Sequence, residues 1–134
     1  MINKNYTKIE FLADLQKADK FRYGFGKLPD PMIITNEDGV ILFVNEAMTE
    51  RTGFSRQEII GRTPGKLWGN QKDEGFYQYM WETIKVDKKS FTSDMVNRRK
   101  DGTYYGCELK IYPIEDDLGN SFFVGIETKF NDVI

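Results

Sequence analysis

The stretch VNRRKDGTYY, residues 96–105, decides how this chain folds. Residues that favour strands lead into it over 91–96 and out of it over 104–114. Asp101-Gly102 lies at the bend, and a glycine after an aspartate supplies the positive φ that a tight hairpin needs. The sequence therefore predicts a β-hairpin with one polar residue, Asn97, among apolar neighbours in its first strand. Such an amide either pairs inside the protein or contacts a ligand.

Three further strands are predicted from apolar runs. Residues 32–35 and 40–44 flank a glycine-containing turn, which is typical of a second hairpin. In residues 121–130, the even-numbered and odd-numbered side chains point to opposite faces, and both faces carry aromatic residues. Two strands before a helical insertion and three after it predict an α+β fold, a five-stranded antiparallel sheet with short helices on one face.

Helices are predicted before and between the strands. Residues 5–21 carry a loose apolar stripe typical of an amphipathic helix, which either covers the second face of the sheet or forms a dimer contact. Asn45 and Ser55 are good N-caps for two short helices. Residues 61–70 are predicted to be an irregular connector, and a longer helix with an aromatic stripe begins after Asp73.

The composition limits the function. At 134 residues, of which 40% are apolar, the chain is long enough for one domain with one core. Its 19 basic and 21 acidic residues give a net charge of −2, which is no footprint for nucleic acid and offers no polybasic contact to an anionic membrane. No apolar run approaches the roughly 20 residues of a membrane span. These features predict neither a nucleic-acid nor a membrane partner.

The chain has no histidine and a single cysteine, Cys107. The lack of histidine excludes a Ser-His-Asp triad, a histidine-ligated haem and a histidine-containing zinc site. One cysteine excludes an intrachain disulfide and a CxxC motif, and it predicts a cytoplasmic location. Residues 61–66 lack the spacing of a phosphate-binding loop. We therefore predict no haem, no metal and no enzyme chemistry.

The order of these elements, with the residues that mark them, resembles the PAS sensory domain family. The resemblance covers residues 28–130, and its short motifs follow one another at the family's spacing. It implies the strand order 2-1-5-4-3, with residues 1–27 as an N-terminal helix or cap and residues 131–134 as a C-terminal tail. It rests on LPDP at 28–31, Asp38-Gly39, Val44-Asn45, TGFS at 52–55, EIIGR at 58–62, NRRKDG at 97–102 and Pro113.

PAS domains bind haem, flavins, small acids or nothing, so the ligand has to be inferred from individual positions. Light-oxygen-voltage PAS domains carry a reactive cysteine after the Gly-Arg of the connector, and Gly61-Arg62-Thr63-Pro64 has none, which argues against that photo-adduct. Redox-sensing flavin PAS domains carry a helix-borne Trp and an Asn in a Val-Asn-Arg-Arg stretch, which Trp81 and Asn97 match. Cys107 and Glu127 stand where light-sensing domains have an Asn and a Gln. The resemblance implies FAD or FMN as the favoured ligand.

Six residues are candidates for the cofactor site. An Asn side chain has one acceptor and two donors, so Asn97 can pair with two adjacent atoms on a flavin edge. A Trp can stack on the ring or flank it. Trp68 in the connector either gates a pocket or plugs it, and a buried Glu127 either protonates or finds a partner. The cofactor-binding candidates are Asn97, Trp81, Glu127, Cys107, Trp68 and Met80, and in the simpler interpretation they are core residues or, for Glu127, solvated.

The resemblance implies a sensory module of signal transduction, as in two-component systems. Ligand occupancy or charge would shift hydrogen bonds on the sheet and bias a flanking helix or a dimer interface. The expected partners are a second copy of the chain and an effector such as a histidine kinase or a cyclic-dinucleotide enzyme. The alternative is a ligand-free PAS module for dimerisation or protein interaction, with its cavity filled by Phe, Trp and Met.

Overall fold

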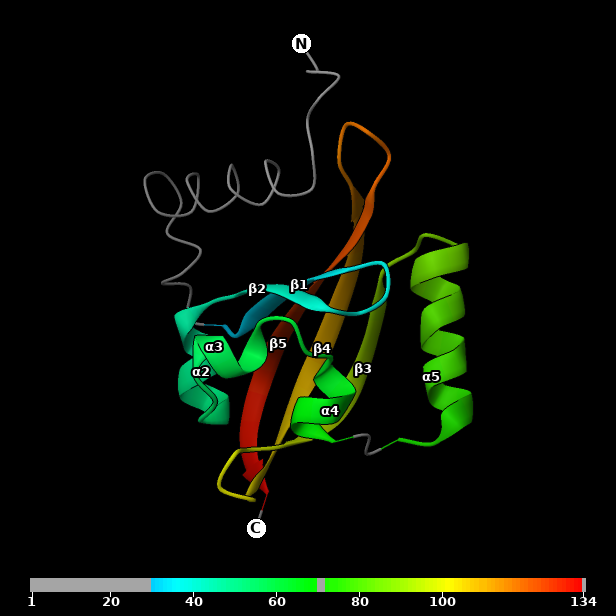
Figure 1. The fold of residues 1–134 in the computed structure, drawn as a ribbon. Helices are drawn as coiled ribbons and strands as arrows, with labels where there is room; N and C mark the ends of the chain where they lie inside the picture. The colour runs from blue at the N-terminus through cyan, green and yellow to red at the C-terminus, as the bar shows by residue number, and fades with distance from the viewer. Residues whose placement is uncertain (1–29, 70–71, 134) are drawn as a thin grey trace.

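The computed structural model describes residues 30–69 and 72–133. Their strands form one antiparallel sheet in the order β2-β1-β5-β4-β3, and the helices lie together on one side of it (Figure 1). The predicted α+β fold and strand order are confirmed, while the helix predicted over residues 5–21 lies outside the described residues. The strands are β1 (Met32–Asn36), β2 (Ile41–Val44), β3 (Phe91–Arg98), β4 (Tyr104–Glu115) and β5 (Ser121–Val133).

Four short α-helices and one π-helical turn connect β2 to β3. The turn continues the last α-helix without a break, and within the described residues no helix combines the length and apolarity needed to cross a membrane. The segments are α2 (Glu46–Thr52), α3 (Arg56–Ile59), α4 (Pro64–Trp68), α5 (Glu74–Trp81) and η3 (Glu82–Val86).

Two predicted helix caps are formed as expected. Asn45 caps α2, because its Oδ1 accepts a hydrogen bond from the N–H of Met48 at 3.0 Å. The same oxygen accepts from the N–H of Met32 at 3.0 Å, and the Asn45 Nδ2 donates to the carbonyl of Asp30 at 2.9 Å. Ser55 and Glu58 form the capping box of α3. Asn45 thus joins the start of β1 to the start of α2.

The predicted irregular connector contains a helix, so that expectation was wrong over residues 64–68. Pro64 occupies the first turn of α4, where its missing N–H costs nothing, and its fixed φ suits a helix. The following helix buries Leu67 and Trp68 in the core. Burial of these two side chains accounts for the helix. The segment is too short for a periodic pattern in the sequence to predict it.

The last strand carries a β-bulge and runs further than predicted. Gly106 of β4 pairs with Asn131, whereas Glu108 pairs with Thr128, so β5 holds one extra residue between the two pairs. Lys129 lies there with a φ of 51°, in the left-handed region. Beyond the bulge β5 continues to Val133, past the predicted end at residue 130, because β4 offers three more pairing residues at 104–106.

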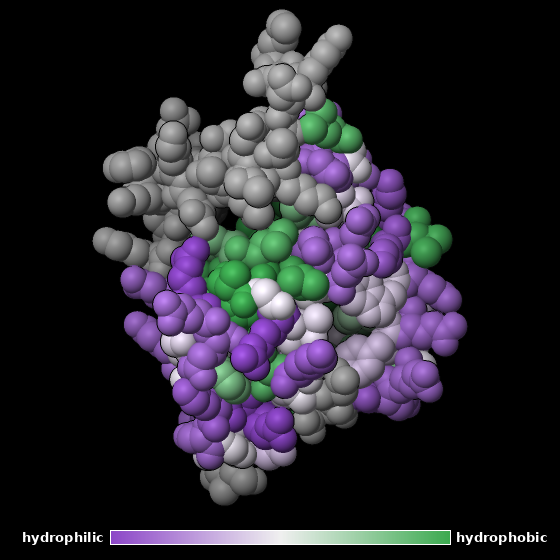
Figure 2. Space-filling model, viewed as in Figure 1, coloured by the Kyte–Doolittle hydropathy of each residue, from purple (hydrophilic) through white to green (hydrophobic). Residues whose placement is uncertain are grey.

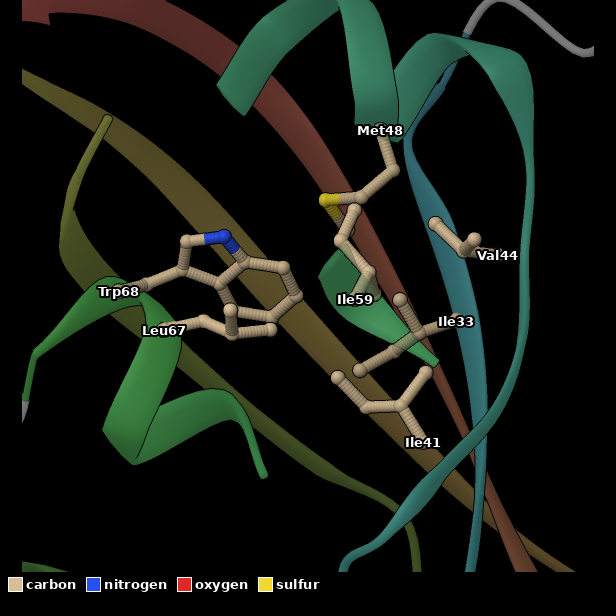
Figure 3. Close-up of a cluster of buried hydrophobic side chains, with 7 residues drawn as sticks. All are labelled: Ile33, Ile41, Val44, Met48, Ile59, Leu67 and Trp68. Carbon is tan, nitrogen blue, oxygen red and sulfur yellow. The ribbon is translucent and has the colours of Figure 1, made fainter. Parts of the chain in front are cut away.

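The sheet buries apolar side chains on both faces, as the two-faced aromatic pattern predicted. On the face away from the helices, Met32, Ile34, Phe43 and Phe122 form one buried cluster. In the view of Figure 2, hydrophilic residues cover most of the described surface, and hydrophobic residues gather over the β1–β2 region. The main cluster on the helix side is drawn in Figure 3 and consists of Ile33, Ile41, Val44, Met48, Ile59, Leu67 and Trp68.

Substituting Gly39 with alanine is expected to cost about 2 kcal/mol of unfolding free energy. Gly39 has a φ of 82°, and a Cβ built there would lie 3.3 Å from Cη2 of Trp81, so alanine adds both backbone strain and crowding. Gly61→Ala is the matched control, since its φ is 87° but nothing lies within 4 Å of the added Cβ. Urea unfolding of both variants measures the difference, and equal losses would contradict a close Trp81 contact.

Candidate functional site

A cavity of about 130 Å³ lies between the sheet and the helices. It is where the separate apolar clusters of the helix side meet, with Ile33, Ile111 and Phe123 among its sheet residues. Its lining is mainly apolar, and the surface is hollowed between α4 and α5 in the view of Figure 2. A cavity of about 150 Å³ holds one benzene ring, so this space is that of a one-ring molecule.

Three polar side chains form one hydrogen-bonded cluster on the sheet. The Asn97 Nδ2 donates to Oε2 of Glu127 at 2.9 Å and to the hydroxyl of Tyr105 at 3.2 Å. The Tyr105 hydroxyl donates to Oε1 of Glu127 at 2.7 Å. Asn97 and Glu127 line the cavity, and all three residues are buried. Each oxygen of the Glu127 carboxyl therefore has a donor from a neighbouring side chain.

Burial shifts the titration of this cluster. Removal from water raises the pKa of Glu127 from 4.5 to about 7, while the hydrogen bond from Tyr105, the charge of Arg51 and the hydrogen bond from Asn97 oppose the rise. Burial and the nearby Glu127 raise the pKa of the Tyr105 hydroxyl and of the Cys107 thiol. Glu127 is thus a buried carboxyl that changes charge near neutral pH, and Cys107 remains a thiol.

A cationic cluster connects the far end of β5 to α2. The guanidinium carbon of Arg51 lies 3.8 Å from the centre of the Phe130 ring, a cation–π contact. Arg99 donates from Nε to the carbonyl of Arg51 at 2.9 Å and pairs with Asp132 at 2.6 Å. Phe130 also packs on Tyr105, with ring centroids 5.7 Å apart. The cluster around Glu127 is therefore continuous with the last residues of β5.

Trp68 has an unusual environment on the helix side of the cavity. Only 3% of its surface is exposed, and its ring extends from α4 toward Met48 (Figure 3). Within the described part of the chain, its Nε1 is the one buried side-chain polar atom without a hydrogen-bond partner. Buried N–H groups are nearly always paired, so this donor calls for an explanation.

A second wall of the cavity comes from α5. Trp81 packs edge-on against Phe123, with ring centroids 5.7 Å apart, and lies against Gly39 at the turn between β1 and β2. Met80 is buried beside it and also lines the cavity. The lack of a Cβ at Gly39 lets the Cη2–Cζ2 edge of the Trp81 ring approach that turn closely.

Five of the six candidate site residues meet at this cavity. Asn97, Trp81, Glu127, Trp68 and Met80 all line it, and Glu127 is buried rather than solvated. Cys107 is also buried, but it packs with Met95 and Tyr105 and is not among the lining residues. In the described residues, no three acidic or cysteine side chains come close enough to hold a metal ion.

Tyr105 was missed as a member of this cluster, although a signal for it exists. Asn97 and Tyr105 are equally distant from Asp101 at the centre of the hairpin, so they face each other across β3 and β4. Extending the hairpin register by four residues on each side of the turn would have paired them.

The chain matches the PAS domain family over residues 29–129. It is 27% identical over 86 residues to a nitrogen fixation regulatory protein of Klebsiella oxytoca. The aligned region covers 64% of this chain and 17% of that protein. It is 34% identical over 99 residues to a blue-light photoreceptor of Listeria monocytogenes, covering 72% of this chain and 39% of that one. The chain thus spans well under half the length of these relatives.

Solved structures show the same fold. The PAS domain of an HTR-like protein from Haloarcula marismortui superposes with a TM-score of 0.69 at 19% identity and covers 95% of this chain and all of that one. The LOV domain of a blue-light activated histidine kinase from Erythrobacter litoralis gives a TM-score of 0.65 at 27% identity, covering 76% of this chain and 96% of that one. Together with the family match over residues 29–129, these likenesses show that the chain belongs to the PAS domain family.

Proposed function

We propose that this chain is the sensory module of a larger cytoplasmic signalling protein and that its cavity binds a small molecule. The main observation behind this proposal is an apolar cavity with a hydrogen-bonded polar pair, Asn97 and Glu127, on its sheet side. Apolar pockets with a few convergent polar groups are the usual form of a small-molecule site. The named relatives include a nitrogen fixation regulatory protein, a blue-light photoreceptor and the LOV domain of a blue-light activated histidine kinase, which supports a sensory role.

Among ligands, a flavin is favoured by the chemistry of the polar groups. The edge of a flavin ring alternates N–H and C=O groups, and an amide beside a carboxyl that titrates near neutral pH can both donate and accept there. Trp81 and Met80 would flank the ring, and a bound FAD or FMN would supply redox or light-dependent chemistry. The 130 Å³ cavity holds one ring, so three fused rings require Trp68 or its neighbours on α4 to move outward.

The signal would leave the cavity through β5. Asn97 uses both hydrogens of its amide, one on Glu127 and one on Tyr105. A ligand that draws this amide away removes a donor from Glu127, which raises the pKa of that carboxyl and favours its neutral form. Phe130 and Asp132 follow on the same strand, so the change reaches the end of β5, where an effector or a second copy of the chain would respond. The effector is a histidine kinase or a cyclic-dinucleotide enzyme.

A ligand-free interaction module is the second candidate, and two observations favour it. The cavity is smaller than the roughly 300 to 1,000 Å³ of most ligand pockets. The polar cluster is also internally paired, since Glu127 accepts a hydrogen bond on each oxygen. In this case the PAS domain would act through dimerisation or through another protein interaction.

Visible absorption of the purified chain separates the two candidates. The flavin proposal expects absorption bands of an oxidised flavin, and denaturation with subsequent chromatography identifies the released cofactor as FAD or FMN. A colourless protein that takes up neither FAD nor FMN on titration would contradict flavin binding. Size-exclusion chromatography with light scattering on the same sample reports whether the chain forms the expected homodimer.

Asn97→Leu is expected to weaken flavin binding about tenfold or more, because leucine keeps the size of the side chain but removes its donors. The matched control is Asp94→Asn, an exposed position on the same strand, which should bind as the wild type does. Fluorescence titration with FMN measures both affinities. Equal affinities for Asn97→Leu and the wild type would remove Asn97 from the site.

A further inference from the structure

The unpaired N–H of Trp68 identifies the kind of ligand that this cavity takes. Trp68 lies in the main apolar cluster, whose other buried members are aliphatic side chains and Met48, none of which has a side-chain oxygen (Figure 3). Its Nε1 is fully buried and has no partner within the described residues. The same side chain lines the cavity.

The other polar groups of the lining do not answer this donor. Glu127 accepts from Asn97 and Tyr105, and the Thr35 hydroxyl donates to the carbonyl of Asn36 at 3.0 Å. The Tyr77 hydroxyl and the Asn97 amide oxygen also belong to lining residues, and neither accepts from Nε1. A bound water needs two to four polar partners, which a mainly apolar wall around Trp68 does not offer. Because Nε1 itself is not exposed to the cavity, the indole has to turn toward the ligand, and an acceptor on the ligand then satisfies the donor while these bonds stay intact.

We propose that the part of the ligand held in this cavity is an uncharged, flat aromatic ring that presents a hydrogen-bond acceptor, a carbonyl oxygen or a ring nitrogen, to the Trp68 N–H. The lack of charge is inferred from the lining, which contains no Lys or Arg and holds its one carboxyl in a hydrogen-bonded cluster. The aromatic character is inferred from the cavity volume, which matches one ring, and from the aromatic residues of the lining, Trp68, Trp81, Tyr77 and Phe123. The inference rests on the proposed ligand-binding function and deepens it.

Two sources of this chemistry exist, a flavin ring and a smaller heteroaromatic molecule. A flavin also needs α4 to move outward, but toward both molecules the proposed role of Trp68 is that of a hydrogen-bond donor. If Trp68 is a plug, it blocks the cavity, so a smaller side chain at this position should let ligands bind more tightly. A donor binds, so its removal costs affinity only for ligands that carry an acceptor. The two roles therefore predict opposite effects of the same substitution.

The test uses benzene and neutral pyridine, which differ by one acceptor, on the whole chain and on Trp68→Phe. Phenylalanine keeps an aromatic ring and removes the N–H. Affinities from NMR titration give the pyridine preference, the ratio of the two dissociation constants, in each protein. We expect Trp68→Phe to lower this preference at least about fivefold, because pyridine then buries an acceptor with no donor. Trp81→Phe is the control, which makes the same chemical change in the same cavity and should alter both affinities together.

Each outcome decides the inference. A fall in preference that is specific to Trp68→Phe supports it. Tighter binding of both probes to Trp68→Phe, with an unchanged preference, assigns Trp68 as a plug and overturns it, while the ligand-binding function stands. If neither probe binds and no cofactor is released from the purified chain, both proposals fail. If the chain is isolated with a flavin, Trp68→Phe should release it faster than the wild type, and slower release overturns the inference.

Discussion

Replacing Asn45 with alanine is expected to lower the free energy of unfolding by about 3 kcal/mol or more. The substitution removes at least three hydrogen bonds at a side chain that is 2% exposed, and it leaves the buried N–H groups of Met32 and Met48 without this acceptor. Each buried polar group that loses its partner costs about 1 to 3 kcal/mol, and the loss of a helix cap alone costs about 1. Urea unfolding monitored by circular dichroism measures the change.

Ser55→Ala provides the comparison for Asn45. Ser55 also caps a helix, but its bond to the N–H of Glu58 is exposed, so water replaces it and the loss should stay near 1 kcal/mol. Equal losses for the two alanine variants would mean that the contacts of Asn45 to β1 contribute little. A larger loss for Asn45 would identify it as the joint between the sheet and the helical layer.

Glu127→Gln is expected to stabilise the protein by up to about 3 kcal/mol above neutral pH and hardly at all near pH 4.5. In the folded protein the pKa of Glu127 is about 7, above its ordinary 4.5, so the native state holds the proton more tightly than the unfolded chain does. The contribution of Glu127 to the unfolding free energy of the wild type is therefore fully present below pH 4.5 and decreases as the pH rises from 4.5 to 7. Above pH 7 it no longer changes. Glutamine is neutral throughout and removes this slope, since Asn97 can turn its amide to meet it.

The stability difference between Glu127→Gln and the wild type, measured by urea unfolding from pH 4 to 8, isolates this carboxyl from all others. Glu108→Gln serves as the control, because Glu108 lies outside the buried cluster and pairs with Lys129 at 3.2 Å. Its difference from the wild type gives the effect of removing a carboxyl outside that cluster. A difference that stays constant with pH for Glu127→Gln would show that this carboxyl has the same pKa in the folded protein as in the unfolded chain.

The fold follows from local signals that agree with one another. The Asp101-Gly102 turn, with Gly102 at a φ of 89°, fixes the β3–β4 hairpin, and the caps at Asn45 and Ser55 fix where the first helices begin. These features depend on the geometry of a few neighbouring residues, which the sequence specifies directly. Helix α4 is too short for periodicity, and only the burial of Leu67 and Trp68 reveals it.

Five of the six candidate residues line one cavity, while their role in binding a cofactor stays a prediction. Asn97, Glu127 and Trp81 lie on separate elements, and the family resemblance brought them together before the structure did. The pairing of Tyr105 with Glu127, and the absence of Cys107 from the lining, depend on the register and the bulge of β5, which alternation alone does not reveal. The unpaired Nε1 of Trp68 is a property of the packed interior, so no sequence pattern predicts it.

The bulge at Lys129 has a consequence for comparing this domain with its relatives. In a regular strand, odd and even residues stay on opposite faces, yet Phe130 and Asp132 share the helix-covered face with Glu127, because Phe130 packs on Tyr105 and Asp132 pairs with Arg99. A relative that lacks the extra residue therefore aligns correctly only with a one-residue gap at 128–130. Chimaeras that join this domain to a new effector should exchange segments beyond Val133, so that both halves of β5 keep the faces they now present.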